Sequence, residues 1–109
     1  MPTVYKVLGQ SNPSATTATT LYTVPSATQA IVSTITVCNQ AASAGTYRVA
    51  IRPDGASLAA QHYIAYDVSI PANSTDTLTL GVTLGDTDVI TVYASSASFS
   101  FGAFGSEIS

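Results

Sequence analysis

The sequence predicts an all-β fold: one antiparallel β-sandwich domain of about eight strands, spanning residues 1–109. Apolar and polar residues alternate with a period of two along most of the chain, and helical periodicity is almost absent. Residues that favour turns interrupt these runs at the spacing typical of a sandwich or barrel. A chain of 109 residues is long enough for one domain with its own core. The strand connectivity remains open between a jelly roll and an immunoglobulin-like Greek key.

The first predicted strands lie between residues 3 and 39. Thr3–Leu8 is expected to form a short edge strand on which Lys6 discourages pairing with other molecules. The segment Ser11–Thr20 is rich in Ser, Thr and Ala and is predicted to be a surface loop. The next stretch, Thr20–Asn39, contains no charged residue and divides into two strands at a turn led by Pro25.

The longer of these two strands is predicted to expose two different faces. One face, expected to lie on the core, consists of Ile31, Ser33, Ile35 and Val37. The opposite face consists of Val32, Thr34, Thr36 and Cys38. It lacks the charges typical of a solvent-exposed surface, so we expect it to pack under another segment or to contact a neighbouring subunit. Cys38 is the only cysteine and is expected to be a small, buried or half-buried strand residue.

The middle of the chain predicts two further strands. In the run 46–52, Tyr47, Val49 and Ile51 are expected to point to the core. A turn at Pro53-Asp54-Gly55 ends this strand, and residues 56–61 have room for one helical turn. The strand at 62–70 is predicted to place on one face His62, Ile64, Tyr66, Val68 and Ile70.

The last third of the chain predicts three more strands. Residues 77–84 alternate Thr with Leu and Val, and a Gly85-Asp86 turn follows them. In the strand at 88–94, one face is expected to carry Ile90, Val92 and Ala94. The final strand, 98–101, leads into a segment from Gly102 to Gly105 whose glycines indicate a bulge or close packing.

The low charge of the sequence excludes several functional classes. Only 8% of the residues are charged, against about 25% in a typical soluble domain. With Lys6, Arg48 and Arg52 as the only cations, the chain lacks the basic surface on which phosphate binding depends. No apolar run is long enough to span a membrane, and the first residues do not form a secretory signal. We therefore expect a cytoplasmic product that binds neither nucleic acid nor membrane.

Catalytic chemistry has little support in the sequence. His62 is the only histidine, Asp67 is predicted to face the other way on the same strand, and no Gly-x-Ser-x-Gly motif is present. Asp86 and Asp88 supply too few oxygens for calcium and are better explained as turn residues. Asn73 lies in a glycosylation sequon but is expected to be a turn residue as well. The sequence thus predicts no enzyme and no catalytic, cofactor-binding or metal-binding residue.

Six tyrosines form the remaining candidate group. Tyr47 and Tyr66 are in phase with apolar neighbours and are expected in the core. Tyr63 and Tyr93 are out of phase with the core positions, which favours a role in a protein interface. Together with the uncharged strand face, the predicted interface residues are Tyr63, Tyr93, Val32, Thr34 and Thr36.

Several segments also resemble a recurrent pattern in small structural proteins of tailed-bacteriophage virions, especially those of cyanophages. These segments are Thr20-Leu-Tyr-Thr-Val-Pro25, Ala30-Ile-Val-Ser-Thr-Ile-Thr-Val-Cys-Asn39, Ala44-Gly-Thr-Tyr-Arg-Val-Ala-Ile51, Gly81-Val-Thr-Leu84, Asp88-Val-Ile-Thr-Val-Tyr93 and Phe104-Gly-Ser-Glu-Ile108. The resemblance covers nearly the whole chain, but its motifs are strands and turns and include no active-site residues.

The resemblance implies an all-β module that assembles into a virion in the host cytoplasm. A capsid cement or decoration protein is favoured, because the chain has no coiled coil or fibre repeat. The implied partners are the major capsid protein or other virion proteins, together with further copies of the chain in a dimer or trimer. A tail, neck, baseplate or fibre-associated subunit is an alternative. A second alternative is a glycan-binding module that exposes its tyrosines.

Overall fold

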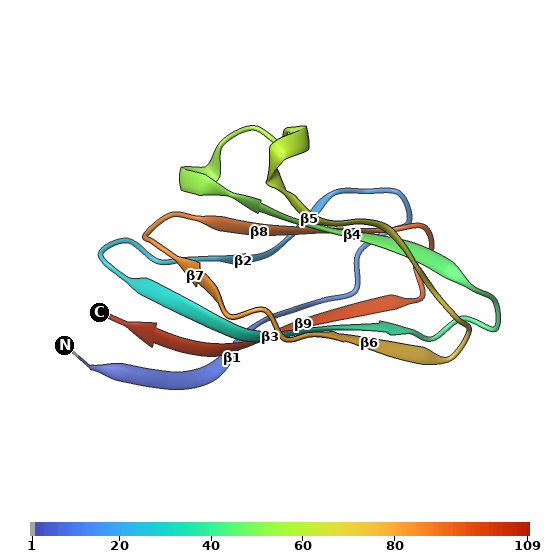
Figure 1. The fold of residues 1–109 in the computed structure, drawn as a ribbon, viewed down its shortest axis with the longest axis horizontal. Coiled ribbons are helices and arrows are strands. Elements are labelled where there is room, and N and C mark those ends of the chain that lie inside the picture. The colour runs from blue at the N-terminus through green and yellow to red at the C-terminus, as the bar shows by residue number, and fades with distance from the viewer. Residues whose placement is uncertain (1) are drawn as a thin grey trace.

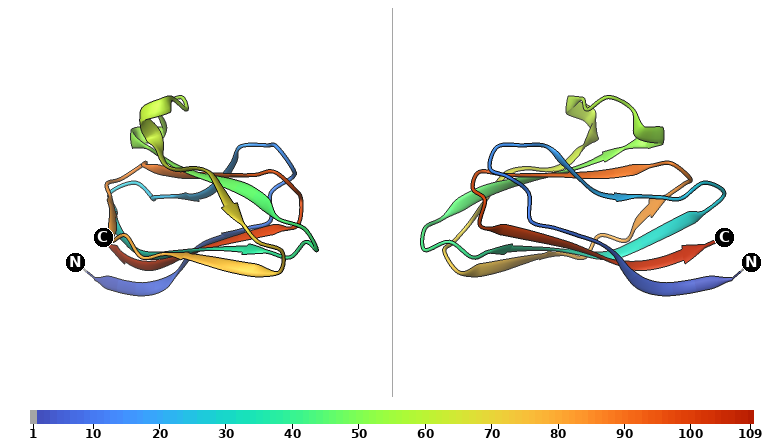
Figure 2. Two further views of the ribbon diagram at one scale, coloured as in Figure 1. Left: turned by 45° about the vertical axis from the view of Figure 1, so that its right-hand side comes forward. Right: turned by 180° about the vertical axis from the view of Figure 1, so that it is seen from behind.

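The computed structural model describes residues 2–109 and contains two antiparallel sheets packed face to face (Figures 1 and 2). The five-stranded sheet contains β1 (Thr3–Ser11), β9 (Phe99–Ile108), β3 (Gln29–Asn39), β6 (Ser74–Leu78) and β7 (Val82–Leu84). The four-stranded sheet contains β2 (Thr19–Thr23), β8 (Val89–Ala94), β4 (Gly45–Arg52) and β5 (Tyr63–Ile70). The predicted all-β sandwich is therefore confirmed.

The strand order resolves the connectivity in favour of a jelly roll. The five-stranded sheet runs β1-β9-β3-β6, with β7 also on β3, and the four-stranded sheet runs β2-β8-β4-β5. Strands from the two halves of the chain pair in sequence: β1 with β9, β2 with β8, β3 with β6 and β7, and β4 with β5. This nested antiparallel ribbon, folded over itself, is the double-sheet jelly roll.

Four segments differ from their predicted bounds. The last strand, expected at 98–101, continues through Gly102–Gly105 and forms β9 over Phe99–Ile108. The predicted strand at 77–84 is split into β6 and β7 around Gly81, whose φ of 66° ends the first piece. The predicted loop is shorter, because β1 extends to Ser11 and β2 begins at Thr19. The helical turn predicted at 56–61 is present only at the end of that range, as the 3-10 turn η2 (Ala60–His62), and a further 3-10 turn, η1 (Pro53–Gly55), lies before it. Residues 53–62 stand on the outer side of the four-stranded sheet at one end (Figure 1).

The core fills the space between the sheets with aliphatic and aromatic side chains and one buried amide, that of Asn39. Its largest fully buried members are Tyr47, Phe99, Ile35, Ile70, Ile90, Val24, Val32, Val37, Val49, Val92 and Asn39. The inward positions predicted for β4 and β8 are confirmed, and Tyr47 packs edge-on against Phe101 with ring centroids 6.3 Å apart. The buried Asn39 side chain donates to three backbone carbonyls, those of Ser43, Ile70 and Pro71, and so ties three segments together.

The predicted core face of β3 is wrong in its first half. Ile31 is 42% exposed, whereas Val32 is 1% exposed and belongs to the core. The cause is a β-bulge: Val32 lies opposite Gly105 and Thr34 opposite Phe104, so Ser33 is an extra residue. One extra residue reverses which side chains point inward, because the side-chain period of a strand is two.

The predicted core face of β5 is wrong for the same reason. Tyr66 was expected in the core but is 57% exposed, and Ile64 is exposed as well. Here Tyr47 lies opposite Val68 and Val49 opposite Ala65, so two β5 residues, Tyr66 and Asp67, face the single residue Arg48. Asp67 adopts the left-handed conformation, with φ of 50°, and thereby turns Tyr66 to the outer side.

The β3 bulge predicts that Gly105 cannot be replaced. A Cβ at this position would lie 1.9 Å from the Ile31 carbonyl oxygen. Relief of this clash would require β9 and β3 to move apart at the bulge, which would disturb their pairing. We expect Gly105→Ala to lower the free energy of unfolding by about 2 kcal/mol or more, the scale of overpacking. Gly85→Ala is the matched control, because its nearest neighbour would be 3.8 Å away. Denaturant unfolding of both variants measures this difference, and equal stabilities would contradict the close approach.

Candidate functional site

The outer side of the five-stranded sheet is the most extensive candidate interaction surface. Residues that lie directly opposite one another in paired strands share a face, so the register identifies its members. We call these positions the uncharged face. They are Thr3, Tyr5, Val7, Gln10, Gln29, Ile31, Thr34, Thr36, Cys38, Thr75, Thr77, Thr83, Ser100, Gly102, Phe104, Ser106 and Ile108.

All nine charged residues of the chain lie away from this face. Three of them point to the inner side of the five-stranded sheet, because the strand register aligns them with core residues of β3: Lys6, Asp76 and Glu107. Arg48, Arg52 and Asp67 lie on the outer side of the other sheet. The remaining three occupy turns and are Asp54, Asp86 and Asp88. A ligand protein would therefore meet hydroxyls, amides and apolar groups on the uncharged face.

The inward charges at one end of the sandwich are held in a hydrogen-bonded cluster. Glu107 accepts a hydrogen bond from the Tyr22 hydroxyl on its Oε2 atom and one from Lys6 Nζ on its Oε1 atom, at 2.5 Å and 3.1 Å. The hydrogen bond from Tyr22 lowers the pKa of Glu107, and the contact with Lys6 adds to this effect. Burial of the carboxylate acts in the opposite direction but is outweighed. Burial, reinforced by the same carboxylate, raises the pKa of Tyr22. The cluster joins β1 and β9 to β2 of the opposite sheet.

A similar bond lies farther along the sandwich. The Tyr47 hydroxyl donates to Asp76 Oδ2 at 3.0 Å and joins β4 to β6. Burial of the Tyr47 ring, together with the hydrogen bond to Asp76, raises the pKa of Tyr47 to about 12. Both inward carboxylates are thus satisfied by tyrosine hydroxyls, as buried polar groups require.

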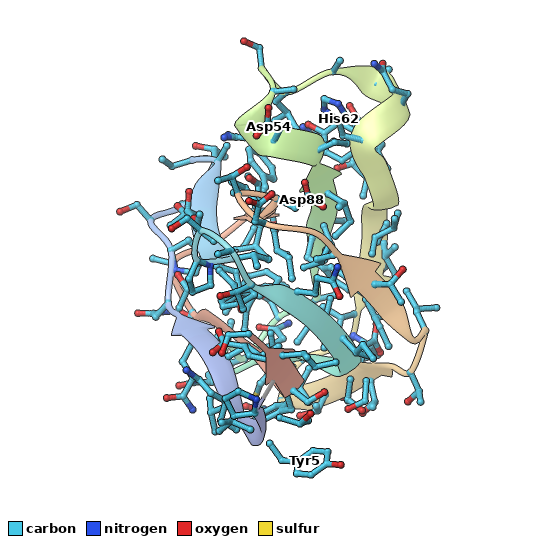
Figure 3. The ribbon with its side chains drawn as sticks, turned by 90° about the vertical axis from the view of Figure 1, so that its left-hand side faces the viewer. Tyr5, Asp54, His62 and Asp88 are labelled. Carbon is cyan, nitrogen blue, oxygen red and sulfur yellow. The ribbon has the colours of Figure 1, made fainter. Side chains whose placement is uncertain are left out.

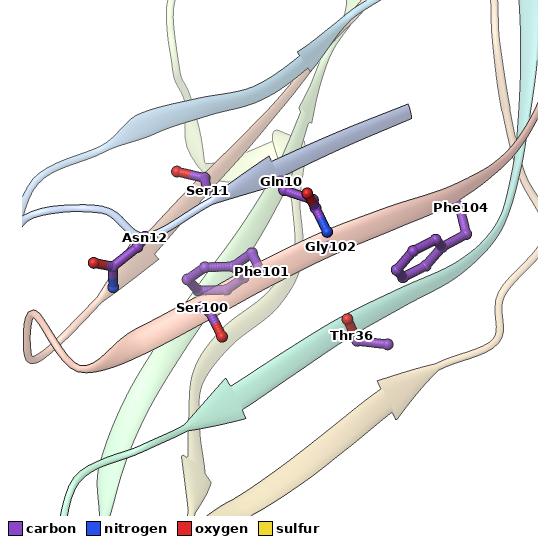
Figure 4. Close-up of a pocket in the computed structure, with 8 residues that line it drawn as sticks. All are labelled: Gln10, Ser11, Asn12, Thr36, Ser100, Phe101, Gly102 and Phe104. Atoms are coloured by element: carbon purple, nitrogen blue, oxygen red, sulfur yellow. The ribbon is translucent and has the colours of Figure 1, made fainter. Parts of the chain in front are cut away.

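A shallow hollow of about 400 Å³ lies on the uncharged face beside β1 and β9 (Figure 4). The Phe104 ring lies over Gly102, where a Cβ would meet both this ring and the Thr36 hydroxyl at 3.0 Å. The hollow is lined by Gln10, Ser11, Asn12, Thr36, Ser100, Phe101, Gly102 and Phe104. None of these side chains titrates near neutral pH, so the hollow offers contact area and hydrogen bonds but no acid, base or activated nucleophile.

The opposite sheet carries a different arrangement, which we call the Arg48 cluster: Arg48, Tyr66, Asp67 and Tyr93. The Arg48 guanidinium lies 4.2 Å from the centroid of the Tyr66 ring and 4.3 Å from that of Tyr93. Its Nε and Nη2 atoms donate to the two carboxylate oxygens of Asp67, at 2.7 Å and 3.3 Å. The bond to Asp67 raises the pKa of Arg48. The β5 bulge builds this cluster, because it places Tyr66 and Asp67 opposite Arg48.

The polar residues singled out as possible catalytic or metal groups have structural contacts. Asp88 accepts from the Asp54 and Gly85 backbone N–H groups, each at 2.8 Å, and His62 Nδ1 accepts from the Ala59 N–H at 3.0 Å (Figure 3). The predicted turn roles of Asp88 and Asp54 are confirmed. Asn73 is also a turn residue, with φ of 53°. Within residues 2–109, no group of three or more His, Cys, Asp or Glu side chains is placed to hold a metal ion.

The five predicted interface residues are divided among three places. Thr34 and Thr36 lie half-buried on the uncharged face. Tyr63 and Tyr93 are half-buried on the outer side of the four-stranded sheet, around the Arg48 cluster. Val32 is wrong as an interface residue, because the β3 bulge turns it into the core.

Sequence reasoning missed the most exposed aromatic and apolar positions. Tyr5 is 84% exposed and projects from the side of the sandwich opposite to the loop of Asp54 and His62 (Figure 3). Val4, Val7 and Ile31 are exposed by 50%, 49% and 42%. The exposure of Tyr5 and Val7 could have been predicted from their position on an edge strand, where apolar residues lack a neighbouring strand on one side.

No family model, curated protein or solved structure matches the chain. None of the helical segments within residues 2–109 has the length and apolar character to cross a membrane.

The Glu107 cluster predicts a pH dependence of stability. Because the folded state lowers the pKa of Glu107, the cluster stabilises the protein above the unfolded pKa of about 4.3. That contribution is lost as the pH falls through the lower, folded value. We expect thermal unfolding to show wild type more stable than Glu107→Gln at neutral pH and the difference to shrink in acid. Tyr22→Phe, which removes the strongest donor, should weaken the same dependence. A difference that grows in acid would contradict this assignment.

Proposed function

We propose that this chain is a structural protein of a tailed-bacteriophage virion, of the cement or decoration type, which binds the assembled head and stabilises it by bridging capsid subunits. The observation that carries the proposal is the absence of charge from all seventeen positions of the uncharged face. The jelly roll, a fold common among viral capsid domains, is consistent with it. The resemblance of the strand segments to such virion proteins supports the same reading.

The uncharged face is large enough for a stable contact. Strand β3 contains eleven residues, which at about 3.3 Å per residue gives a length of roughly 36 Å. Four strand positions at about 4.8 Å give a width of roughly 19 Å, hence an area of roughly 700 Å². Each partner in a standard protein interface contributes about 800 Å². The face of one copy therefore provides most of a standard interface.

The composition of the face also suits a contact that stays assembled. Threonine and serine side chains lose less hydration on burial than lysine or glutamate would, and no charge is left unpaired. Contacts of this kind are insensitive to ionic strength, whereas ion pairs at a surface are screened by salt. Binding only to the assembled shell adds the binding free energy to the stability of the shell. A tail, neck, baseplate or fibre-associated subunit would use the same face, on a different partner.

Adding a charge to the uncharged face tests the proposal. Purified protein is added back to particles that lack it, and occupancy and heat resistance are measured by electron microscopy and genome release. We expect wild type to restore both and Thr36→Lys to bind at least about tenfold more weakly, because the new ammonium is buried without a partner. Ser69→Lys is the matched control, since Ser69 is exposed on the other sheet.

Two outcomes would contradict the proposal. If particles that lack the protein show the same decoration of the shell and the same heat resistance as particles that contain it, the protein is not a cement. If Thr36→Lys and Ser69→Lys bind equally well, the uncharged face is not the docking surface. Thermal unfolding of both variants confirms that a loss of binding does not come from a loss of fold.

We further infer that a second copy of the chain pairs with the open edge of β1. Strand β1 ends the five-stranded sheet and is paired on one side only, with β9. Its first half is exposed and carries Val4, Tyr5 and Val7, and it contains a single charge, Lys6, which is already held by Glu107. Its second half is covered, because Gly9 lies against the backbone of Leu21 in β2. The open part therefore spans residues 3–7.

The charge on β1 excludes a register centred on Lys6, and we propose the register centred on Tyr5, the middle of the open part. An antiparallel two-fold pair that keeps the sheet continuous must place residues of the same face opposite one another. Centring the axis on Lys6 would bring two ammonium groups together. Centring it on Tyr5 places Tyr5 against Tyr5 of the second copy, Thr3 against Val7, and Val4 against the aliphatic stem of Lys6. Both uncharged faces then lie on the same side and form one wider docking surface.

Disulfide formation between copies tests this register. In a Cys38→Ser background, Tyr5→Cys should form a covalent dimer on oxidation, because residues directly opposite have Cβ atoms about 5 Å apart. Thr3→Cys is the matched control: its two copies would lie roughly 14 Å apart along the paired strands. Non-reducing electrophoresis measures the dimer fraction. Equal fractions for the two variants would exclude the register, and no dimer for either would exclude the edge contact.

A further inference from the structure

A second hollow lies on the side of the sandwich opposite to the uncharged face. It has a volume of about 650 Å³ and is lined by Leu58, Ala59, Ala60, Tyr63 and Tyr66. One wall is the loop between η1 and η2, which stands above the four-stranded sheet (Figure 2). The floor is the outer surface of β5, where the bulge at Tyr66 and Asp67 and a second register shift between Tyr63 and Ala65 leave both tyrosines on the outer side. The volume is in the range of about 300–1,000 Å³ typical of sites for small molecules.

The two tyrosines of the hollow are held in fixed positions before any ligand arrives. Their rings meet edge to face, with centroids 4.9 Å apart and planes at 84°. Tyr66 is also stacked on Arg48, which Asp67 and Tyr93 hold in place. A binding surface ordered in advance loses little conformational entropy when it binds. Despite these contacts Tyr66 remains 57% exposed, so the ring is available to a ligand.

The charges around the hollow select for a neutral ligand. The Arg48 and Asp67 charges compensate each other in a bidentate pair, at 2.7 Å and 3.3 Å. An anion would have to separate this pair to reach the guanidinium, and a cation would compete with Arg48 for the Tyr66 ring. The Asp67 side chain is 46% exposed, so its oxygens can still accept hydrogen bonds.

The remaining surface of the hollow is apolar on one side and polar at its rim. Leu58, Ala59, Ala60 and the tyrosine rings are apolar, while the tyrosine hydroxyls are hydrogen-bonding groups. The Asp67 carboxylate, which lies outside the lining but follows Tyr66 in β5 and shares Arg48 with it, adds hydrogen-bond acceptors nearby. A hydrocarbon ligand would leave these polar groups unpaired. A sugar ring matches both parts, because its C–H groups pack on the face of an aromatic ring and its hydroxyls form hydrogen bonds at the edge.

We propose that this hollow binds a neutral pyranose residue of a glycan, with Tyr66 as the stacking platform and Asp67 as an acceptor for its hydroxyls. The site is independent of the proposed docking function, because it lies on the other sheet. When the uncharged face is docked, the hollow points away from the docked surface. Both contacts are therefore compatible in one molecule.

Backbone amide NMR of the full chain tests the site, with methyl glucoside, methyl galactoside and methyl N-acetylglucosaminide as probes. At least one probe should cause saturable shifts confined to residues 58–67 and their neighbours on β4. Tyr66→Ala should weaken this binding by about tenfold or more, and Tyr66→Phe by less, because it retains the ring. Tyr5→Ala, on the other sheet of the sandwich, should bind as wild type does.

The charge argument and the location have tests of their own. Methyl glucuronide should bind more weakly than methyl glucoside; tighter binding would overturn the assignment of a neutral ligand. Ala60→Leu, which fills the hollow without changing a tyrosine, should abolish the shifts while thermal unfolding stays close to wild type. Absence of saturable shifts with all three neutral probes would overturn the proposal, as would shifts caused only by a proline-rich peptide. None of these outcomes depends on binding to a virion.

Discussion

The hydrogen bonds between tyrosine hydroxyls and inward carboxylates are the constraint on which the surface of this sandwich depends. Glu107 accepts from Tyr22 and Lys6, and Asp76 accepts from Tyr47, so both carboxylates of the five-stranded sheet are satisfied between the layers. A carboxylate at either position without its partner would favour a conformation that reaches water. Because these charges are stable on the inner side, the outer side of the same sheet is free of them. The same bonds join the two sheets, so cohesion of the sandwich and neutrality of its face have one origin.

The fold was predictable from the sequence because two sheets need only alternation and turns, and both are visible in the chain. The positions of Tyr47, Val49, Ile90 and Val92 follow from alternation within uninterrupted strands. The candidate surface was predictable only in part: Thr34 and Thr36 were placed correctly, whereas Val32 was not. The error arises at Ser33, a bulge residue whose side chain gives no sign of an irregular backbone. The only trace in the sequence is on another strand, where Gly105 permits the close approach.

The bulge in β5 limited the prediction of the candidate sites more than the bulge in β3 did. Asp67 takes the left-handed conformation at a position where alternation predicts an ordinary strand, and this turns Tyr66 from the core to the surface. The Arg48 cluster and the tyrosine hollow both depend on that reversal. Their members come from β4, β5 and β8, whose alignment is fixed by tertiary pairing rather than by local sequence. Periodicity alone therefore could identify Tyr63 and Tyr93 as outward residues but could not reveal that Tyr66 lies between them.

The two sheets of the sandwich thus expose surfaces that differ in chemistry and suit different contacts. A flat array of hydroxyl and methyl groups suits a broad protein contact, because its strength comes from area and it needs no compensating charges. A small hollow with fixed aromatic rings suits a small ligand, because a few well-placed groups supply its specificity. In a free monomer, however, an open edge with exposed valines and tyrosine invites pairing with other chains, and the single lysine on β1 is already engaged by Glu107. Natural edges are usually protected by charge or by cover, and on β1 charge gives little protection. In the pairing proposed above, the second copy of the chain supplies the cover that charge does not give to this edge.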